Sequence, residues 1–211
     1  MWRDWIGTQV SEDGMTEHEQ VHDYIWQRLD EPGSEHLRLW QSADGSGDLQ
    51  VDSQVVTVAE GKVLRVSYRM VVAADWRVRS LRIASEQPDG SAIGLVLQTD
   101  GAGSWTDGSG APLDELQGCL DVDIAVTPFT NTLPIRRLRL APGQTETIRV
   151  VYVPVPSLDV SPLGQRYTAL EDGRVRYESV QSGFSRELEV DTSGLVMSYP
   201  GLFRRTWPRG T

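Results

Sequence analysis

Two aspartates two residues apart, Asp121 and Asp123, are the first pattern in this chain with chemical meaning. They lie in the segment 119–126, where apolar and other residues alternate. This alternation predicts a β-strand with one buried face and with both carboxylates on the opposite face, roughly 6–7 Å apart. At that distance two carboxylates could act as acid and base on a glycosidic bond, hold a cation, or accept hydrogen bonds from sugar hydroxyls. The plainer interpretation is the solvent-exposed face of a half-buried strand.

Directly after this strand the sequence predicts a short helix. Thr127-Pro128 is a helix start, because the hydroxyl can cap the first turn and the proline fits the first helical position. Pro134 removes a backbone donor and clashes with the preceding turn, so we expect the helix to span about residues 128–133. A further strand is expected over 135–140, where leucines and arginines alternate.

Basic and aromatic side chains provide partners for the two aspartates. Three arginines follow the helix, and acids buried beside arginines stay ionised and form charge-assisted hydrogen bonds. We expect Arg136 to hold the acids in place. Gln165-Arg166-Tyr167 and Tyr177-Glu178 are polar-aromatic clusters that could face a pocket or form a ladder on the surface. The candidate ligand-binding residues are Asp121, Asp123, Glu35, Arg136, Arg166, Tyr167 and Tyr177.

The run His18 to His22 reads His-Glu-Gln-Val-His, the pattern in which two histidines on one helix face hold zinc and the glutamate acts as a base. Its flanks are acidic or strand-like, unlike a buried amphipathic helix, and His36 is the one further histidine that could be a third ligand. We therefore expect a solvated acidic segment and no metal. The chain has no phosphate-binding glycine loop, G-x-S-x-G elbow or dinucleotide fingerprint, and no other cofactor is expected.

The totals argue against several classes of protein. With 30 Asp and Glu against 20 Lys and Arg, the net charge is -10, which disfavours binding to nucleic acid or to an anionic membrane. A single cysteine, Cys119, excludes an intrachain disulfide framework. No run of eighteen apolar residues occurs, and the first residues lack the apolar run of a signal peptide. We therefore expect a cytoplasmic protein without stable membrane insertion.

Turn dipeptides such as Asp89-Gly90 and Asp172-Gly173 separate short β-compatible runs along most of the chain, which is a strong hairpin signal. So many runs predict a mainly β fold, a many-stranded antiparallel sheet curled into a barrel-like wrap. This sheet forms one domain over 21–206, with an extension before it at 1–20 and a tail after it at 207–211. Prolines 154, 156 and 162 are expected at an edge or in a connection. The predicted strands are 21–29, 35–41, 48–58, 62–72, 76–86, 91–99, 119–126, 135–140, 146–154, 165–170, 174–181, 184–190 and 195–199.

Several motifs carry a resemblance to a known family. They are GCLDVD at 118–123 and TPFTNTLPIRRL at 127–138, supported by Glu35-His36-Leu37, Gln165-Arg166-Tyr167, Ser182-Gly183-Phe184 and the run 199–203. With them, residues 25–205 resemble the bacterial "putative glycolipid-binding" family. The resemblance implies a sheet wrapped around a single helix, here the one at 128–133, and a tight homodimer. It also implies an acidic pocket, for which Asp121 and Asp123 are the candidates, and a distant likeness to lipoprotein-carrier folds.

Three functions remain open at this point. The leading hypothesis is non-enzymatic binding of a glycolipid or similar amphiphile in an apolar cavity, with hydroxyl groups bound by an acidic rim of Asp121, Asp123 and Glu35. The rival is an enzyme that acts on a sugar or lipid-linked substrate with the two aspartates as acid and base. The third is a dimeric scaffold in which arginines fully occupy the carboxylates.

Overall fold

The structure is a computed structural model that describes residues 20–59 and 61–209. Residues 1–19 of the predicted extension, which include His18 and Glu19 of the zinc-binding pattern, lie outside these residues. His22, which is described, is the first residue of strand β1. In the described part of the chain no group of three or more His, Cys, Asp or Glu side chains is placed to hold a metal ion.

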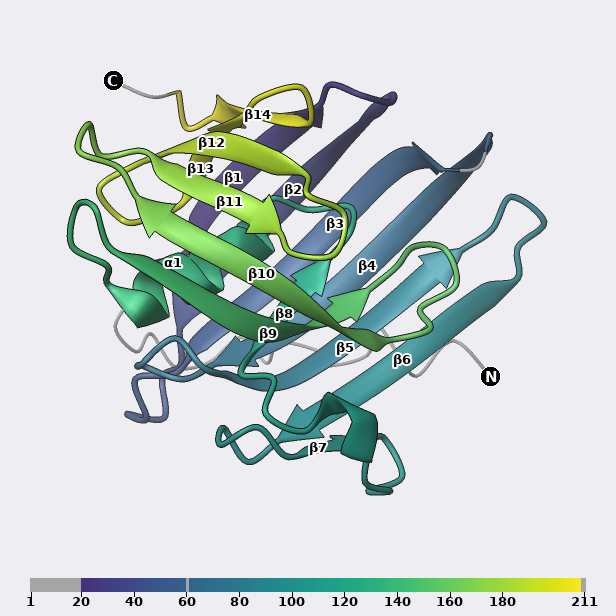
Figure 1. The fold of residues 1–211 in the computed structure, drawn as a ribbon. Helices are drawn as coiled ribbons and strands as arrows, with labels where there is room; N and C mark the ends of the chain where they lie inside the picture. The colour runs from purple at the N-terminus through teal and green to yellow at the C-terminus, as the bar shows by residue number, and fades with distance from the viewer. Residues whose placement is uncertain (1–19, 60, 210–211) are drawn as a thin grey trace.

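The described residues form one sheet of fourteen strands in the order β7-β6-β5-β4-β3-β2-β1-β14-β13-β12-β11-β10-β9-β8 (Figure 1). Neighbouring strands are antiparallel, except that β8 and β9 are parallel. The mainly β, mostly antiparallel class predicted from the turn dipeptides is confirmed. The strands are β1 His22–Arg28, β2 Gly33–Gln41, β3 Leu49–Ala59, β4 Lys62–Val72, β5 Val78–Glu86, β6 Ala92–Thr99, β7 Trp105–Asp107, β8 Asp121–Ile124, β9 Thr145–Val153, β10 Ser161–Ala169, β11 Val175–Ser179, β12 Ser185–Val190, β13 Val196–Tyr199 and β14 Phe203–Trp207.

The sheet is open, so the expectation of a strongly curled, barrel-like sheet is wrong. Strands β7 and β8 are its two edges, and within the described ranges no ladder joins them. Both edge strands are short. In place of a ladder, hydrogen bonds link strand β7 and the loop before it to the segment that leads into β8. The Trp105 indole N–H donates to the Cys119 carbonyl at 2.8 Å, and the Gly118 N–H donates to the Gly103 carbonyl at 2.9 Å.

The helical stretch begins at Phe129, close to the predicted start at 128 but as a 3₁₀ turn, and it ends later than predicted. A 3₁₀ turn, η3 (Phe129–Asn131), leads into α1 (Thr132–Leu138), so the strand expected over 135–140 is wrong. Pro134 is the third residue of α1, in the first turn, where the helix needs no N–H from it. The helix ends at Leu138, and the next residue, Arg139, has a left-handed φ of 49°. Proline therefore lies inside this helix and does not terminate it.

Side chains from both halves of the sheet and from the helical segment pack together in one hydrophobic core. Buried side chains of β2, β3, β4 and β5, among them Leu37 and Leu81, belong to one cluster with Val151 of β9 and with Phe129 and Leu133. A smaller, mostly aromatic cluster lies among β10–β14. Strands β2, β3 and β4 alternate buried positions with more exposed ones, which is why one face of this part of the sheet can cover the helix.

Three further differences from the predicted elements have local causes. Strands β7 and β14 were not predicted, because each is short and adjoins glycine or proline. Strand β10 starts at Ser161, four residues before the predicted strand, so that Pro162 lies inside it and pairs with Val151 of β9. The ladder to β11 starts only at Gln165, so at Pro162 the strand has one neighbour and is locally an edge, which is where proline was expected. Among the described residues, none of the helices is long and apolar enough to cross a membrane.

Candidate functional site

Asp121 is buried in an ion pair. Its carboxylate is fully shielded from solvent and accepts bonds from Arg137 Nε at 3.1 Å and Nη2 at 2.5 Å. This is the two-pronged geometry in which arginine holds a carboxylate most firmly. Burial raises the pKa of Asp121, while the guanidinium of Arg137 and the charge of Arg77 oppose that rise. The interpretation that this strand has a solvent-exposed face is therefore wrong at Asp121.

Asp123 has a different environment, although it lies on the same strand. Its Oδ2 accepts a bond from Gln165 Nε2 at 2.6 Å, and its Oδ1 accepts a longer bond from the Thr130 hydroxyl at 3.4 Å. Both partners are neutral. Burial raises the pKa of Asp123 to about 6, against an ordinary value of 3.8, and the two hydrogen bonds only partly offset that rise.

Asp123 lines a cavity of about 130 Å³. The wall combines one carboxylate, three tyrosines and an apolar side. Burial raises the pKa of each of these tyrosines, so their hydroxyls are neutral donors and acceptors. The lining residues are Asp123, Ile124, Ala125, Thr127, Asn131, Tyr152, Tyr177, Tyr199, Leu202 and Phe203.

Gln165 of β10 connects this cavity to the helix. Its amide group donates to Asp123 and, at 3.3 Å, to the Tyr177 hydroxyl. The Tyr167 hydroxyl lies 3.1 Å from both Gln165 Oε1 and Asn131 Oδ1. The polar groups of β8, β10, β11 and the helix start thus form one buried network, and such networks hold their members in fixed positions when they are satisfied.

Glu35 was expected on the acidic rim, but the structure places it elsewhere. It is 2% exposed and accepts hydrogen bonds from Ser53 at 2.7 Å, Tyr68 at 2.7 Å and Thr127 at 2.6 Å. Burial raises its pKa, while these three hydroxyls act in the opposite direction. Thr127 also accepts the Phe129 N–H at 3.0 Å, which is the helix-start bond that the sequence predicted. Glu35 therefore fixes the start of the helix to the sheet and does not line the cavity beside Asp123.

Two of the predicted arginines lie outside the site. Arg136 was expected to hold the aspartates, but its guanidinium lies over the Trp76 ring, 4.9 Å from the ring centroid, and Arg137 takes that role for Asp121. Arg166 bonds Thr147 and pairs with Glu178 at 3.6 Å on the other face of β10.

The remaining predicted aromatic residues are in or beside the site, and two others were missed. Tyr177 lines the cavity, and Tyr167 reaches it through Asn131. Sequence reasoning missed Tyr152 as a candidate, because its strand pattern is common and only its register opposite Asp123 brings it there. Tyr199 carried a signal, since it opens the run 199–203 that contributed to the resemblance.

A second, apolar cavity of about 90 Å³ adjoins the helix. Ile135, Leu138 and Leu140 contribute most of its apolar wall together with strands β10 and β11. The ring of Tyr167 lines this cavity, and its hydroxyl reaches Asn131, which lines the first one. One tyrosine therefore lies between a polar and an apolar hollow.

The fold and this site define a mainly β protein with one short helix in its core and a carboxylate-bearing cavity beside that helix. Residues 23–205 match the family described as "Putative glycolipid-binding", and the chain belongs to this family. A crystal structure of a DUF1089-family protein from Pseudomonas aeruginosa is similar to it, with 34% identity and a TM-score of 0.72. That similarity covers 94% of this chain and 100% of the other. No curated protein matches the chain.

Proposed function

We propose that this protein binds a glycolipid or a similar amphiphile without converting it, and that Asp123 receives hydroxyl groups of the headgroup. The observation that carries the proposal is the position of the Asp123 carboxylate. It is on a cavity wall, held by the neutral partners Gln165 and Thr130. The name of the family to which the chain belongs agrees with this class of ligand.

The chemistry of the wall favours hydroxyl groups. An ionised carboxylate has acceptor sites for several donors, and Gln165 and Thr130 occupy only part of that capacity. The hydroxyls of Tyr152, Tyr177 and Tyr199 can both donate and accept, as a sugar hydroxyl does. Since a pKa of about 6 leaves Asp123 mostly ionised near neutral pH, it can accept hydrogen bonds from a neutral ligand.

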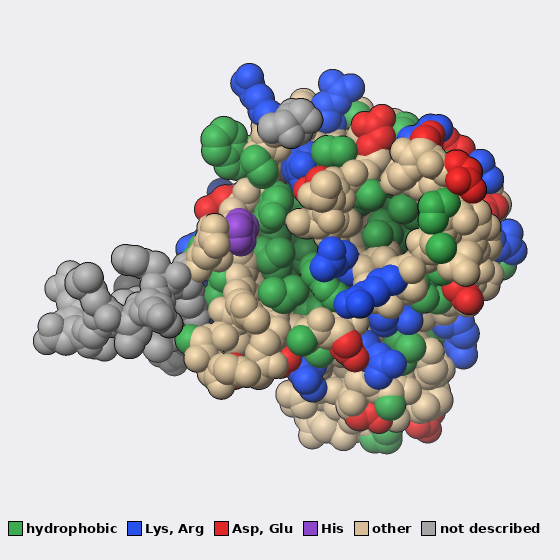
Figure 2. Space-filling model, turned by 90° about the vertical axis from the view of Figure 1, so that its left-hand side faces the viewer, with side chains coloured by type: hydrophobic (Ala, Val, Ile, Leu, Met, Phe, Trp, Pro, Cys, Tyr) green, Lys and Arg blue, Asp and Glu red, His purple; other side chains and the backbone are tan. Residues whose placement is uncertain are grey.

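The size of the cavity limits what enters it. Pockets that enclose drug-sized ligands measure roughly 300–1,000 Å³, so a cavity of about 130 Å³ has room for one end of a headgroup. The rest of an amphiphile needs apolar surface nearby. The cavity beside Ile135 and Leu138 provides some. Figure 2 also shows hydrophobic side chains gathered in a hollow of the surface with basic side chains near it.

An enzyme with paired aspartates is the second candidate, and the raised pKa of Asp123 is the observation in its favour. General acid–base chemistry of that kind needs two carboxylates at the reacting bond. Asp121 is fully shielded, bound by two nitrogens of Arg137, and is not among the residues that line the Asp123 cavity. Binding without turnover is therefore the better supported function.

The test is mass spectrometry of the lipids that stay bound to gently purified protein, for the original chain and for Asp123→Asn. The substitution removes the charge and keeps the shape, and we expect the retained amphiphile to fall about tenfold, as for loss of one charge-assisted hydrogen bond. Asp89→Asn, in an exposed turn between β5 and β6, is the matched control and should retain it fully. Equal retention by Asp123→Asn would contradict the proposal, and turnover of a glycolipid that depends on Asp123 would favour the enzyme.

We further propose that the protein is a homodimer, as the resemblance implies. Light scattering coupled to size exclusion should then give twice the chain mass of 23.5 kDa. A scaffold without ligand would give the same mass but no retained amphiphile, so the two measurements together separate the scaffold from the binding protein.

A further inference from the structure

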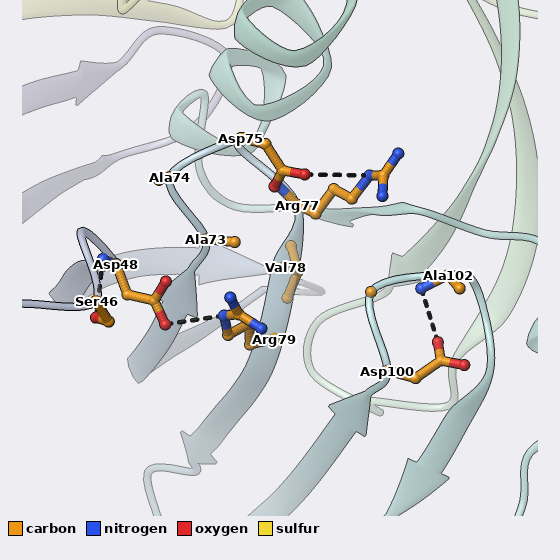
Figure 3. A pocket seen from close by; sticks show the side chains of 11 residues that line it. Ser46, Asp48, Ala73, Ala74, Asp75, Arg77, Val78, Arg79, Asp100 and Ala102 are labelled. Carbon is orange, nitrogen blue, oxygen red and sulfur yellow. Dashed lines mark hydrogen bonds and ion pairs between the residues drawn. The ribbon is translucent and has the colours of Figure 1, made fainter.

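A third cavity, of about 310 Å³, lies among three loops of the first half of the sheet (Figure 3). These loops are β2–β3, β4–β5 and β6–β7, which meet at one end of their strands. No residue lines both this cavity and the one at Asp123. The residues around it are Ser46, Asp48, Ala73, Ala74, Asp75, Arg77, Val78, Arg79, Asp100, Gly101 and Ala102.

The charges at this cavity are mixed and largely balanced. Arg79 Nε lies 2.8 Å from Asp48 Oδ2, and Arg77 Nε lies 3.6 Å from Asp75 Oδ2. Asp100 Oδ1 accepts bonds from two backbone N–H groups, which hold the pKa of this carboxyl below its usual range. Figure 3 shows Arg79 on strand β5 and Asp100 on the β6–β7 loop, on opposite sides of the space.

Hydrogen-bonding capacity remains on both sides. The second oxygen of Asp48, Oδ1, is buried without a hydrogen-bond partner, and the side chain as a whole is 13% exposed. A buried acceptor that makes no hydrogen bond is unfavourable, so a donor that reached this oxygen would be stabilised. Each guanidinium also has five N–H groups, more than its one carboxylate neighbour can accept. Donors and acceptors therefore face the same space.

We propose that this cavity binds a neutral, hydroxyl-rich molecule, a sugar or polyol. Three carboxylates against two arginines disfavour an anion, and arginines already beside carboxylates disfavour a cation. A hydroxyl satisfies both kinds of group, because it donates to a carboxylate and accepts from a guanidinium. Val78 and the alanines leave apolar surface for the C–H groups of such a ligand.

The test is a titration of the full, isotope-labelled chain with three probes, followed by the amide NMR signals. The probes are glucose and myo-inositol, each raised to about 50 mM, and octyl glucoside raised to just below its micelle concentration, which detects dissociation constants in the millimolar range. Inorganic phosphate at about 50 mM is titrated as the anionic control. We expect signals of residues 73–79 and 100–102 to shift. Asp48→Asn should weaken binding about tenfold. Asp89→Asn, in the turn at the other end of β5, should bind as the original chain does.

The outcomes separate the sources and the sites. Equal binding of glucose and octyl glucoside supports a site for free sugars, and tighter binding of octyl glucoside supports a site for the headgroup of a lipid. Shifts confined to residues around Asp123, no shift with any probe, or stronger shifts with inorganic phosphate would overturn this proposal. Since the two cavities share no residue, the proposal for Asp123 is tested separately by its own variant.

Discussion

Asp123→Asn should make the protein more stable at neutral pH, although it alters the residue proposed to bind the ligand. Burial raises the pKa of Asp123 from 3.8 to about 6 in the folded state, so folding there favours the protonated acid. At about 1.4 kcal/mol per pKa unit, the difference corresponds to roughly 3 kcal/mol that the ionised form costs the folded state. Asparagine is never ionised, and its oxygen can still accept the bond from Gln165.

The sign of the pH dependence follows from linkage. Between about pH 4 and pH 6 the folded state binds more protons than the unfolded state, so its stability falls as pH rises through this window. Asp123→Asn lacks this dependence. Its advantage over the original chain should be near zero below about pH 4 and reach roughly 2–3 kcal/mol above about pH 7.

Urea unfolding of both proteins across this range measures the difference. The shared titrations of other groups cancel in the comparison. Asp89→Asn is the control. The hydrogen bonds from Ser91 lower the pKa of the exposed Asp89 carboxyl, so the Asp89→Asn variant should gain no stability over the original chain as pH rises. The same stability difference at about pH 4 and about pH 8, or a less stable Asp123→Asn at about pH 8, would refute the reasoning.

Two further predictions concern the helix. Arg137→Met leaves Asp121 buried without its cation and should lower the free energy of unfolding by roughly 3–5 kcal/mol in urea, whereas Arg139→Met, at an exposed position, should lower it by less than about 1 kcal/mol. A similar loss for both variants would contradict the ion-pair argument. Gly194→Ala places a Cβ 2.8 Å from Arg136 Cδ, while Gly90→Ala, at a similar positive φ, meets nothing within 4 Å. We expect Gly194→Ala to lower the free energy of unfolding by roughly 1–3 kcal/mol more than Gly90→Ala does, which a lower thermal midpoint would show. Equal midpoints for the two variants would contradict a tight contact at Gly194.

Local features of the sequence predicted most strands. Asp-Gly turns and two-residue alternation are properties of neighbouring residues, and they located β1 to β6 and β9 to β13 within a few residues. The start of the helix was equally local, since Thr127 accepts the Phe129 N–H two residues ahead. Short strands such as β7 and β14 could not be found in this way, because three to five residues give too little alternation to read.

The choice of arginine could not be made from the sequence. On a strand, residues 136 and 137 would point to opposite faces, whereas on α1 they point about 100° apart. This rotation sends Arg136 over Trp76 and Arg137 to Asp121. The sequence predicts that the helix ends at Pro134, so it places Arg136 and Arg137 on a strand and not on the helix.

By itself the sequence determined a mainly β chain of hairpins, a helical stretch that starts close to residue 128, and the two aspartates before it. Only the tertiary structure decided that Asp121 is closed off by Arg137 and that Asp123 lines a cavity with three tyrosines. The tertiary structure also buries Glu35 in the interior, whereas the sequence placed it on the rim of a pocket. The reason is physical: alternation depends on the nearest residues in the chain, whereas the burial and partners of a carboxylate depend on strands that lie many residues away.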